Sequence, residues 1–207
     1  MKYKGSKWRI AKHILPIILK DREKGQFYVE PFCGGCNVID KVDGNRIAND
    51  NNQYLIEMLR AYTNGVSYPD TIKKEDYLYW REQAKLGHWD KGHIGWVLFM
   101  SSYDGRYIGY KLKSGRDKIK ESISNINKQS GSLKGIDFRC KSYTELGIPY
   151  KSIIYCDPPK TGLDFDVFYD WCRVNAKNGH KIFISKYIMP SDFICVWEGK
   201  YEKLYTL

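Results

Sequence analysis

The sequence predicts an α/β fold in which helices cover a parallel sheet and an insertion interrupts the chain. Short apolar segments that fit strands alternate with segments of helical apolar spacing in residues 1–64 and again in residues 136–207, and this alternation is typical of a parallel sheet. Residues 65–135 differ, because they are rich in Tyr, Trp, Gly and Lys and their periodicity is mixed. We therefore expect a core formed by residues 1–64 and 136–207, with residues 65–135 inserted into it.

The first part of the core predicts two strands between two helices. Pro16 is expected to kink or break the first helix. In the second helix the apolar side chains share one face, formed by Leu55, Met58, Leu59 and Tyr62. The predicted elements are a helix at residues 9–20, strands at residues 25–32 and 46–50, and a helix at residues 52–62.

The insertion reads as mainly helical, and the sheet pattern resumes after it. The dipeptide formed by Asp104 and Gly105 is a turn signal, so residues 101–116 are expected to form a hairpin or loop. The other predicted elements are helices at residues 75–87, 93–102, 117–129 and 166–178, and strands at residues 135–140, 152–156, 180–187, 192–197 and 201–207.

The charge balance favours a polyanionic partner. Lys and Arg total 34 against 24 Asp and Glu, which gives a formal net charge of +10 and favours nucleic acid over a membrane surface. Charge alone is equally compatible with a basic soluble protein that has no such partner. No apolar stretch reaches the length of a membrane span, and the first residues lack the apolar core of a signal peptide. We therefore expect a cytoplasmic protein that does not associate with membranes.

The six cysteines fall mostly in apolar runs, as is typical of reduced, buried thiols in cytosolic proteins. Cys33 and Cys36 form a C-x-x-C pair, but a structural zinc site needs a second such pair or histidines at ligand spacing. Because neither is present, we expect no bound metal.

The first candidate site is the segment VEPFCGGCNV at residues 29–38. It places Glu30 at the end of a predicted strand, followed by the tight turn of Gly34 and Gly35, and such a turn lets the backbone approach a ligand closely. Asp50 ends the next predicted strand, where a carboxylate can accept hydrogen bonds from ribose hydroxyls. Alternatively, Asp50 caps the following helix. The two features together favour a nucleoside cofactor.

The second candidate site follows the apolar run IIYC, where Asp157 precedes Pro158 and Pro159. Open α/β sheets bind ligands at the carboxyl ends of buried strands, and the two prolines stiffen the backbone there. The Asp157 carboxylate and the Pro158 carbonyl are two acceptors that can hold one amino group through both of its hydrogens. In isolation the segment is also compatible with a rigid turn.

Together, five segments resemble the Dam-like DNA adenine-N6 methyltransferases (D12 class, alpha type) in order and spacing. They are YKGSK at residues 3–7, EPFCGG at 30–35, NDNN at 49–52, YCDPP at 155–159 and IFISKY at 182–187. The resemblance implies a Rossmann-like sheet that binds S-adenosylmethionine and a DNA-reading insertion. It also implies methyl transfer to an adenine flipped out of double-stranded DNA, by a monomer in a bacterium or phage-infected host, as in restriction–modification.

The resemblance also implies roles for individual residues. Tyr3 and Lys7 would contact the methionine end of the cofactor, Asp50 its ribose with Asn51 beside it, and Ser142 and Tyr143 its adenine. Asp157 would border the cofactor and, with Pro158, Pro159 and Lys160, form the catalytic segment, while Lys2 would reach the target base pairs. The methionine and ribose would be wrapped by Glu30, Pro31, Phe32, Cys33, Gly34 and Gly35.

Lys160 departs from the family pattern. The family has a tyrosine there, whose ring stacks on the flipped base, and then a loop of about ten residues or more. Here three residues separate Lys160 from Asp164, so we infer a deletion of the ring and the loop together. Base–aromatic stacking contributes about 1–3 kcal/mol, so we expect a weakened or inactive methyltransferase that keeps the fold and the cofactor pocket. A cation beside Asp157 is also expected to favour the ionised carboxylate.

Three nearby rings are candidates to replace the missing tyrosine, namely Phe165, Phe168 and Tyr169, although their helical spacing also fits a core position. Lys186 stands where relatives often have Glu.

The insertion mixes cations with aromatic residues, a composition that suits phosphates and bases. We expect residues 103–111 to meet DNA, with Arg106, Tyr107, Lys111, Lys113 and Arg116 as DNA-binding residues. Alternatively, the aromatic residues form the core of a helical subdomain. The remaining members of the mixture are Lys73, Lys74, Tyr77, Trp80, Arg81, Tyr103 and Tyr110.

Three functions therefore remain open on the sequence. The first is a DNA adenine-N6 methyltransferase, weakened by Lys160. The second is a catalytically inactive relative that binds DNA or S-adenosylmethionine. The third is a methyltransferase that acts on RNA or on a protein amide, because the acceptor pair at Asp157 suits any planar amino group.

Overall fold

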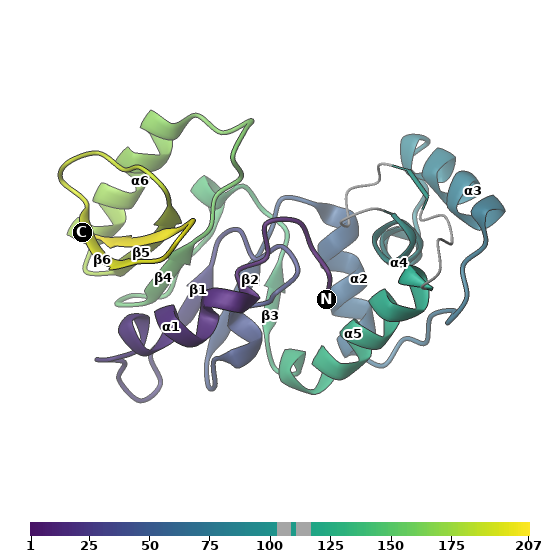
Figure 1. Cartoon of the computed structure of the whole chain (residues 1–207), viewed down its shortest axis with the longest axis horizontal. Coiled ribbons are helices and arrows are strands. Elements are labelled where there is room, and N and C mark those ends of the chain that lie inside the picture. Colours follow the sequence, from purple (N-terminus) through teal and green to yellow (C-terminus); the bar gives the residue numbers. More distant parts are fainter. Residues whose placement is uncertain (103–108, 111–116) are drawn as a thin grey trace. The chain divides into compact units, whose positions relative to one another are not determined.

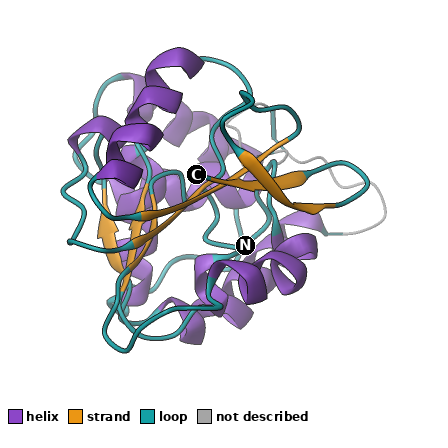
Figure 2. Ribbon diagram, turned by 90° about the vertical axis from the view of Figure 1, so that its left-hand side faces the viewer, coloured by secondary structure: helices purple, strands orange, loops and turns teal. Residues whose placement is uncertain are grey.

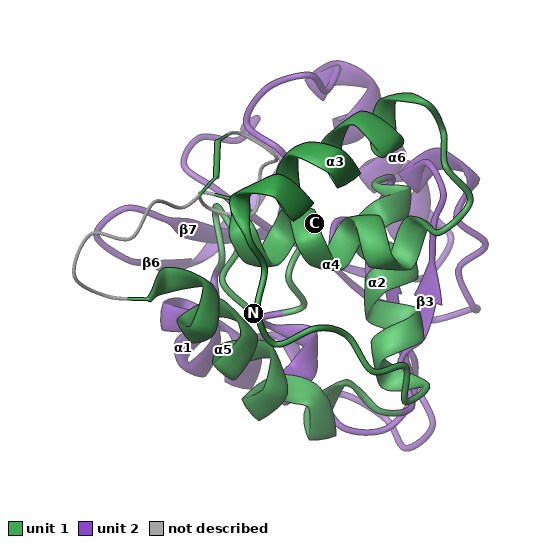
Figure 3. Cartoon of the chain, turned by 90° about the vertical axis from the view of Figure 1, so that its right-hand side faces the viewer, with its two compact units in different colours: residues 1–6, 34–36, 52–134 green, residues 7–33, 37–51, 135–207 purple. Residues whose placement is uncertain are grey.

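The structure, a computed structural model, describes residues 1–102, 109–110 and 117–207. The chain divides into two compact units (Figure 3). Unit 1 comprises residues 1–6, 34–36 and 52–134, and unit 2 comprises residues 7–33, 37–51 and 135–207. The functional division into a core and an insertion at residues 65–135 stays a prediction. In the part of the chain that is described, no helix is both long and apolar enough to cross a membrane.

Unit 2 contains a seven-stranded mixed sheet, which confirms the predicted α/β, Rossmann-like fold class (Figures 1 and 2). The strand order is β3-β2-β1-β4-β5-β7-β6. The strands are β1 (Tyr28–Glu30), β2 (Arg46–Asn49), β3 (Asp137–Arg139), β4 (Ile153–Cys156), β5 (Lys181–Lys186), β6 (Ile194–Glu198) and β7 (Lys203–Thr206).

The predicted parallel sheet carries an antiparallel edge. Strands β1 to β5 pair in parallel, but β7 is antiparallel to both β5 and β6. The link between β6 and β7 is residues 199–202, which is too short for a crossover and suits a hairpin. The strand order reverses between β1 and β4, and open α/β sheets bind ligands at such a switch point.

Helices α1 (Trp8–Ile18) and α6 (Phe165–Lys177) lie on opposite faces of this sheet (Figures 1 and 2). The α6 face buries Phe168 and Cys172 in one cluster with strand residues such as Val29 and Ile154. Because both faces are covered, every residue of β4 is buried. This burial explains why the segment before Asp157 is a continuous apolar run rather than an alternating one.

Unit 1 is helical in its described part, and the helices predicted there are confirmed. Its helices are α2 (Gln53–Thr63), α3 (Lys74–Lys85), α4 (Lys91–Ser101) and α5 (Lys118–Leu133). Helix α4 packs against the other three and is buried along almost its whole length. Most of the predicted hairpin at residues 101–116 lies outside the described residues, although Ser102 and Tyr110 form an antiparallel bridge.

Replacing Gly95 with Ala is expected to destabilise unit 1 by at least about 1–3 kcal/mol, the usual effect of overpacking. A Cβ at Gly95 in α4 would lie 2.1 Å from the carbonyl oxygen of Tyr54 and 2.9 Å from the Cβ of Met58. Thermal unfolding measures the effect. The matched control is Gly131→Ala in α5, where a Cβ meets nothing within 4 Å and the greater helix propensity of Ala adds up to about 1 kcal/mol of stability. Equal melting temperatures for the two variants would contradict this packing.

Candidate active site

The carboxylate of Asp157 lies at the carboxyl end of β4, at the switch point of the sheet. The ammonium of Lys7, the residue before α1, lies 2.7 Å from Asp157 Oδ1 and donates a hydrogen bond to Oδ2 at 3.0 Å. The side chains are 10% and 25% exposed, respectively. A carboxylate oxygen has two lone pairs, so Asp157 can accept from a ligand while it remains paired with Lys7.

Burial raises the pKa of Asp157 to about 6, and it outweighs the opposing effect of Lys7. Glu202 also raises this pKa, and its carboxylate lies 3.6 Å from the Lys7 ammonium. Lys160 lowers the pKa of Asp157, as expected, but its effect is smaller than that of burial. The carboxylate is therefore ionised at neutral pH and takes up a proton in mildly acidic solution.

The residues after Asp157 form the short connection that the sequence indicates. Pro158 is buried, whereas Pro159 and Lys160 are exposed. Asp164 caps α6 by accepting hydrogen bonds from two backbone N–H groups of its first turn. The catalytic assignment of Pro158, Pro159 and Lys160 stays a prediction.

The three rings proposed as replacements for the missing tyrosine differ in their surroundings. Phe168 is fully buried in the core of unit 2, so it is not available to a ligand. Phe165 and Tyr169 are half-buried and both contact the ammonium of Lys186. This ammonium lies 2.9 Å from the centroid of the Phe165 ring and donates to the Tyr169 hydroxyl at 2.7 Å. Burial lowers the pKa of Lys186.

Glu30 ends β1, the strand beside β4, and is only 3% exposed. Burial raises its pKa well above the usual range, and the nearby Asp157 raises it further. The hydroxyl of Tyr28 donates to Glu30 Oε1 at 3.0 Å and acts in the opposite direction. Glu30 forms no ion pair within the described residues, so a cationic ligand placed against it would favour its ionised form.

Asn49, which the sequence analysis did not single out, joins the loops that follow β1 and β3. It ends β2 and is fully buried, and its amide donates to the carbonyls of Pro31 and Lys141, each at 3.0 Å. Its side-chain oxygen accepts from the Lys141 N–H at 3.1 Å, and its carbonyl accepts from Cys33 at 2.8 Å. The only sign of this role in the sequence is a polar residue directly after the apolar residues of a predicted strand.

Asp50 follows β2 directly and is half-buried, with Asn51 exposed beside it. The alternative role for Asp50 as a helix cap is wrong, because the side chain of Asn52 caps α2 by accepting from Tyr54 and Leu55. The Asp50 backbone N–H donates to the carbonyl of Arg139 at 3.3 Å, which holds this residue at the same edge of the sheet as Glu30 and Asp157.

Tyr143 and Phe32, both half-buried, form an aromatic pair with ring centroids 5.3 Å apart. Tyr143 also meets Phe168 and Trp171 edge-on. The neighbouring Ser142 is exposed and its hydroxyl accepts from the N–H of Thr144. The structure thus brings two of the predicted cofactor residues, from the loops after β1 and β3, into direct ring contact.

Four predicted residues belong to unit 1. The ring of Tyr3 lies against Gly34, where an added Cβ would be 2.7 Å from it, and Gly34 has a φ of +46°. The side-chain amide of Gln129 in α5 donates to the carbonyl of Gly35 at 3.2 Å, while Lys2 is exposed. The cofactor role of Tyr3, Gly34 and Gly35 and the base contact of Lys2 stay predictions.

The predicted DNA-binding residues of the insertion divide into two groups. Arg106, Tyr107, Lys111, Lys113 and Arg116 lie outside the described residues. The aromatic residues that are described are packed: Tyr77 is buried, Trp80 lies against two histidine rings, and the Tyr110 hydroxyl donates to the Ile72 carbonyl. For Tyr77 the alternative interpretation as a subdomain core is confirmed, whereas Trp80 and Tyr110 are half-buried and Lys73 and Lys74 are exposed.

None of the six cysteines forms a disulfide. Cys33, Cys36, Cys156 and Cys172 are buried, as expected, whereas Cys195 is exposed. Burial raises the pKa of the Cys156 thiol. Among the residues that the structure describes, no group of three or more His, Cys, Asp or Glu side chains is arranged to hold a metal ion.

Comparison with known proteins bears on the N-terminal part of the chain. No curated protein matches the chain. A family model matches residues 3–85, a range that includes the segments YKGSK, EPFCGG and NDNN but not Asp157. The matched family is the D12 class N6 adenine-specific DNA methyltransferases, so the family resemblance inferred from the motifs is confirmed over residues 3–85.

Proposed function

We propose that this protein transfers a methyl group from S-adenosylmethionine to the N6 amine of an adenine flipped out of double-stranded DNA. The observation that carries the proposal is the carboxylate of Asp157, held by Lys7 at the switch point of an α/β sheet. The family match over residues 3–85 supports the choice of DNA adenine as the substrate.

The side chains around the switch point suit S-adenosylmethionine, the methyl donor in this proposal. The buried carboxyl of Glu30 suits an ammonium group, and the Asp50 carboxylate suits ribose hydroxyls. The half-buried rings of Phe32 and Tyr143 suit an adenine. Ser142, which caps a turn with its hydroxyl, is the weakest part of this assignment.

Asp157 and the Pro158 carbonyl would accept the two hydrogens of the adenine amine and direct its lone pair toward the methyl group. The N–C bond would form as the S–C bond of the methyl donor breaks, S-adenosylhomocysteine would leave as a neutral thioether, and the methylated amine would lose one proton to solvent. Such a step needs no covalent intermediate, so catalysis would consist of positioning and electrostatic stabilisation. Lys7 would orient the carboxylate and Glu202 would in turn hold Lys7, which makes both of them positioning residues.

The test is a methyl-transfer assay with tritiated S-adenosylmethionine and unmethylated genomic DNA, followed by digestion to nucleosides. Label in N6-methyladenine supports the proposal. No label in adenine, with calorimetric binding of the cofactor intact, would favour the inactive relative, whose supporting observation is the exposed Lys160 in place of a ring. Label only in parallel reactions supplied with RNA or protein instead of DNA would favour the third function.

In the same assay, Lys160→Tyr is expected to raise the rate of methyl transfer. A restored ring can stack on the flipped base, which contributes about 1–3 kcal/mol and corresponds to about a ten- to hundredfold change. Thr161→Tyr is the matched control, because it adds the same ring at the next exposed position. Equal rates for the wild type and Lys160→Tyr would show that this ring is not missed.

A further inference from the structure

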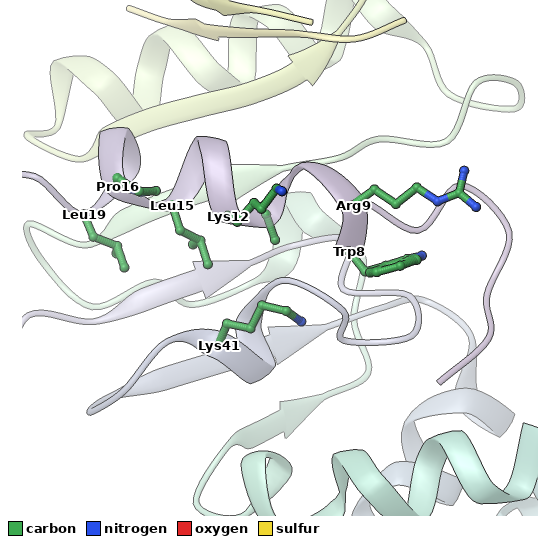
Figure 4. Close-up of a pocket in the computed structure, with 8 residues that line it drawn as sticks. Trp8, Arg9, Lys12, Leu15, Pro16, Leu19 and Lys41 are labelled. Carbon is green, nitrogen blue, oxygen red and sulfur yellow. The ribbon is translucent and has the colours of Figure 1, made fainter. Parts of the chain in front are cut away.

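A groove lies in unit 2 between α1 and the short 3₁₀ helix η1 (Ile39–Lys41) (Figure 4). Its volume is about 740 Å³, within the range of small-ligand sites. The apolar part of its lining includes Leu15, Pro16 and Leu19. The stretch from Trp8 to Leu19 corresponds to about 16 Å of helix, so the groove suits an extended ligand.

The polar side chains that line the groove are all cationic. They are Arg9, Lys12 and Lys41, and Figure 4 places Lys12 on α1 and Lys41 on η1, on either side of the groove. The Lys41 ammonium is anchored by Asp40 at 2.6 Å and by the carbonyl of Asn37 at 2.8 Å. Within the described residues, neither Arg9 nor Lys12 forms an ion pair, so the groove favours an anion.

An aromatic ring stands at one end of the groove. The indole of Trp8 is 57% exposed, and the guanidinium of Arg9 lies 5.6 Å from the ring centroid. Trp8 directly follows Lys7, whose ammonium holds Asp157. A cationic groove with an exposed aromatic platform is the arrangement that binds single-stranded nucleic acid, because the phosphates meet the cations and an unstacked base covers the ring.

We propose that the groove between α1 and η1 binds a single-stranded DNA segment, with a base stacked on Trp8 and phosphates on Arg9, Lys12 and Lys41. Only the choice of DNA rests on the proposed function, because the flipped adenine would lie at Asp157, beside the Trp8 end. An acidic peptide with apolar side chains is the competing occupant, and the ring at the groove end favours the nucleotide.

The test is fluorescence anisotropy with a labelled single-stranded thymidine oligonucleotide and the full chain. Trp8→Ala is expected to weaken binding about ten- to hundredfold, the loss of one stacked base. Lys12→Glu is expected to weaken binding more at low salt than at high salt. The slope of the logarithm of the binding constant against the logarithm of the salt concentration should fall in magnitude by about one or more. Lys20→Glu is the matched control, because this exposed lysine lies outside the groove and the charge change is identical.

Unchanged binding by both groove variants overturns the proposal, and so does equal weakening by Lys20→Glu. Competition by polyglutamate as effective as that of unlabelled oligonucleotide would assign the groove to acidic peptides and overturn it as well. The methyl-transfer assay is independent, since the oligonucleotide contains no adenine. If the groove variants weaken oligonucleotide binding but the protein transfers no methyl group, only the proposed function is contradicted.

Discussion

Replacing Asp157 with Asn is expected to reduce methyl transfer to adenine by about 10²–10³-fold, the usual effect of removing one key electrostatic group from an active site. The amide keeps one acceptor oxygen for the adenine amine but loses the negative charge and replaces the second acceptor with a donor, so the amine is held less strongly and its developing positive charge is not stabilised. The substitution also removes the negative charge that pairs with the Lys7 ammonium, which lies 2.7 Å from Asp157 Oδ1. Initial rates with tritiated cofactor measure the effect.

Asp166→Asn is the matched control, because this exposed carboxylate in the first turn of α6 forms no ion pair within the described residues. It is expected to keep the wild-type rate. Thermal unfolding of both variants separates lost chemistry from lost structure. A folded Asp157→Asn protein that retains more than about a tenth of the wild-type rate would remove this carboxylate from the mechanism.

The pH dependence of methyl transfer is expected to report the pKa of Asp157. The ionised carboxylate is the stronger hydrogen-bond acceptor, so the rate should be full above about pH 6 and fall below it. Lys7→Met removes the largest effect that lowers this pKa, so the acid limb should move to higher pH. The rate at neutral pH should also fall about tenfold, because a charge-assisted hydrogen bond that orients the carboxylate is lost.

Glu202→Gln is the opposing control, because Glu202 raises the pKa of Asp157 and its removal should move the acid limb to lower pH. Shifts in opposite directions cannot come from general destabilisation. Identical pH profiles for the wild type, Lys7→Met and Glu202→Gln would contradict the ion-pair geometry.

Asp157 also affects the stability of the fold. Its pKa is raised from 3.8 to about 6, so the folded state binds the proton more tightly than the unfolded chain does. The contribution of this group to stability therefore falls as pH rises through that window.

The position of Asp157, the carboxylate of the candidate site, could be predicted from the sequence because the signal is local. An apolar run such as that of β4 is buried on both sheet faces, and a polar residue that ends such a run must lie at the sheet edge. The same reasoning placed Glu30 and Asp50 at that edge. It could not decide between a ligand role and a helix cap for Asp50, because that choice depends on Asn52, two residues away.

By itself the sequence determined the α/β class, the order of helices and strands, and the residues at the strand ends. These follow from apolar periodicity and turn residues, which act over a few neighbouring positions. Only the tertiary structure decided that Lys7 holds Asp157 across 150 residues, that Asn49 joins the loops after β1 and β3, and that Phe165 and Tyr169 both contact the ammonium of Lys186. Side-chain pairing of this kind depends on strand register and on which helix covers which face, and periodicity does not encode either.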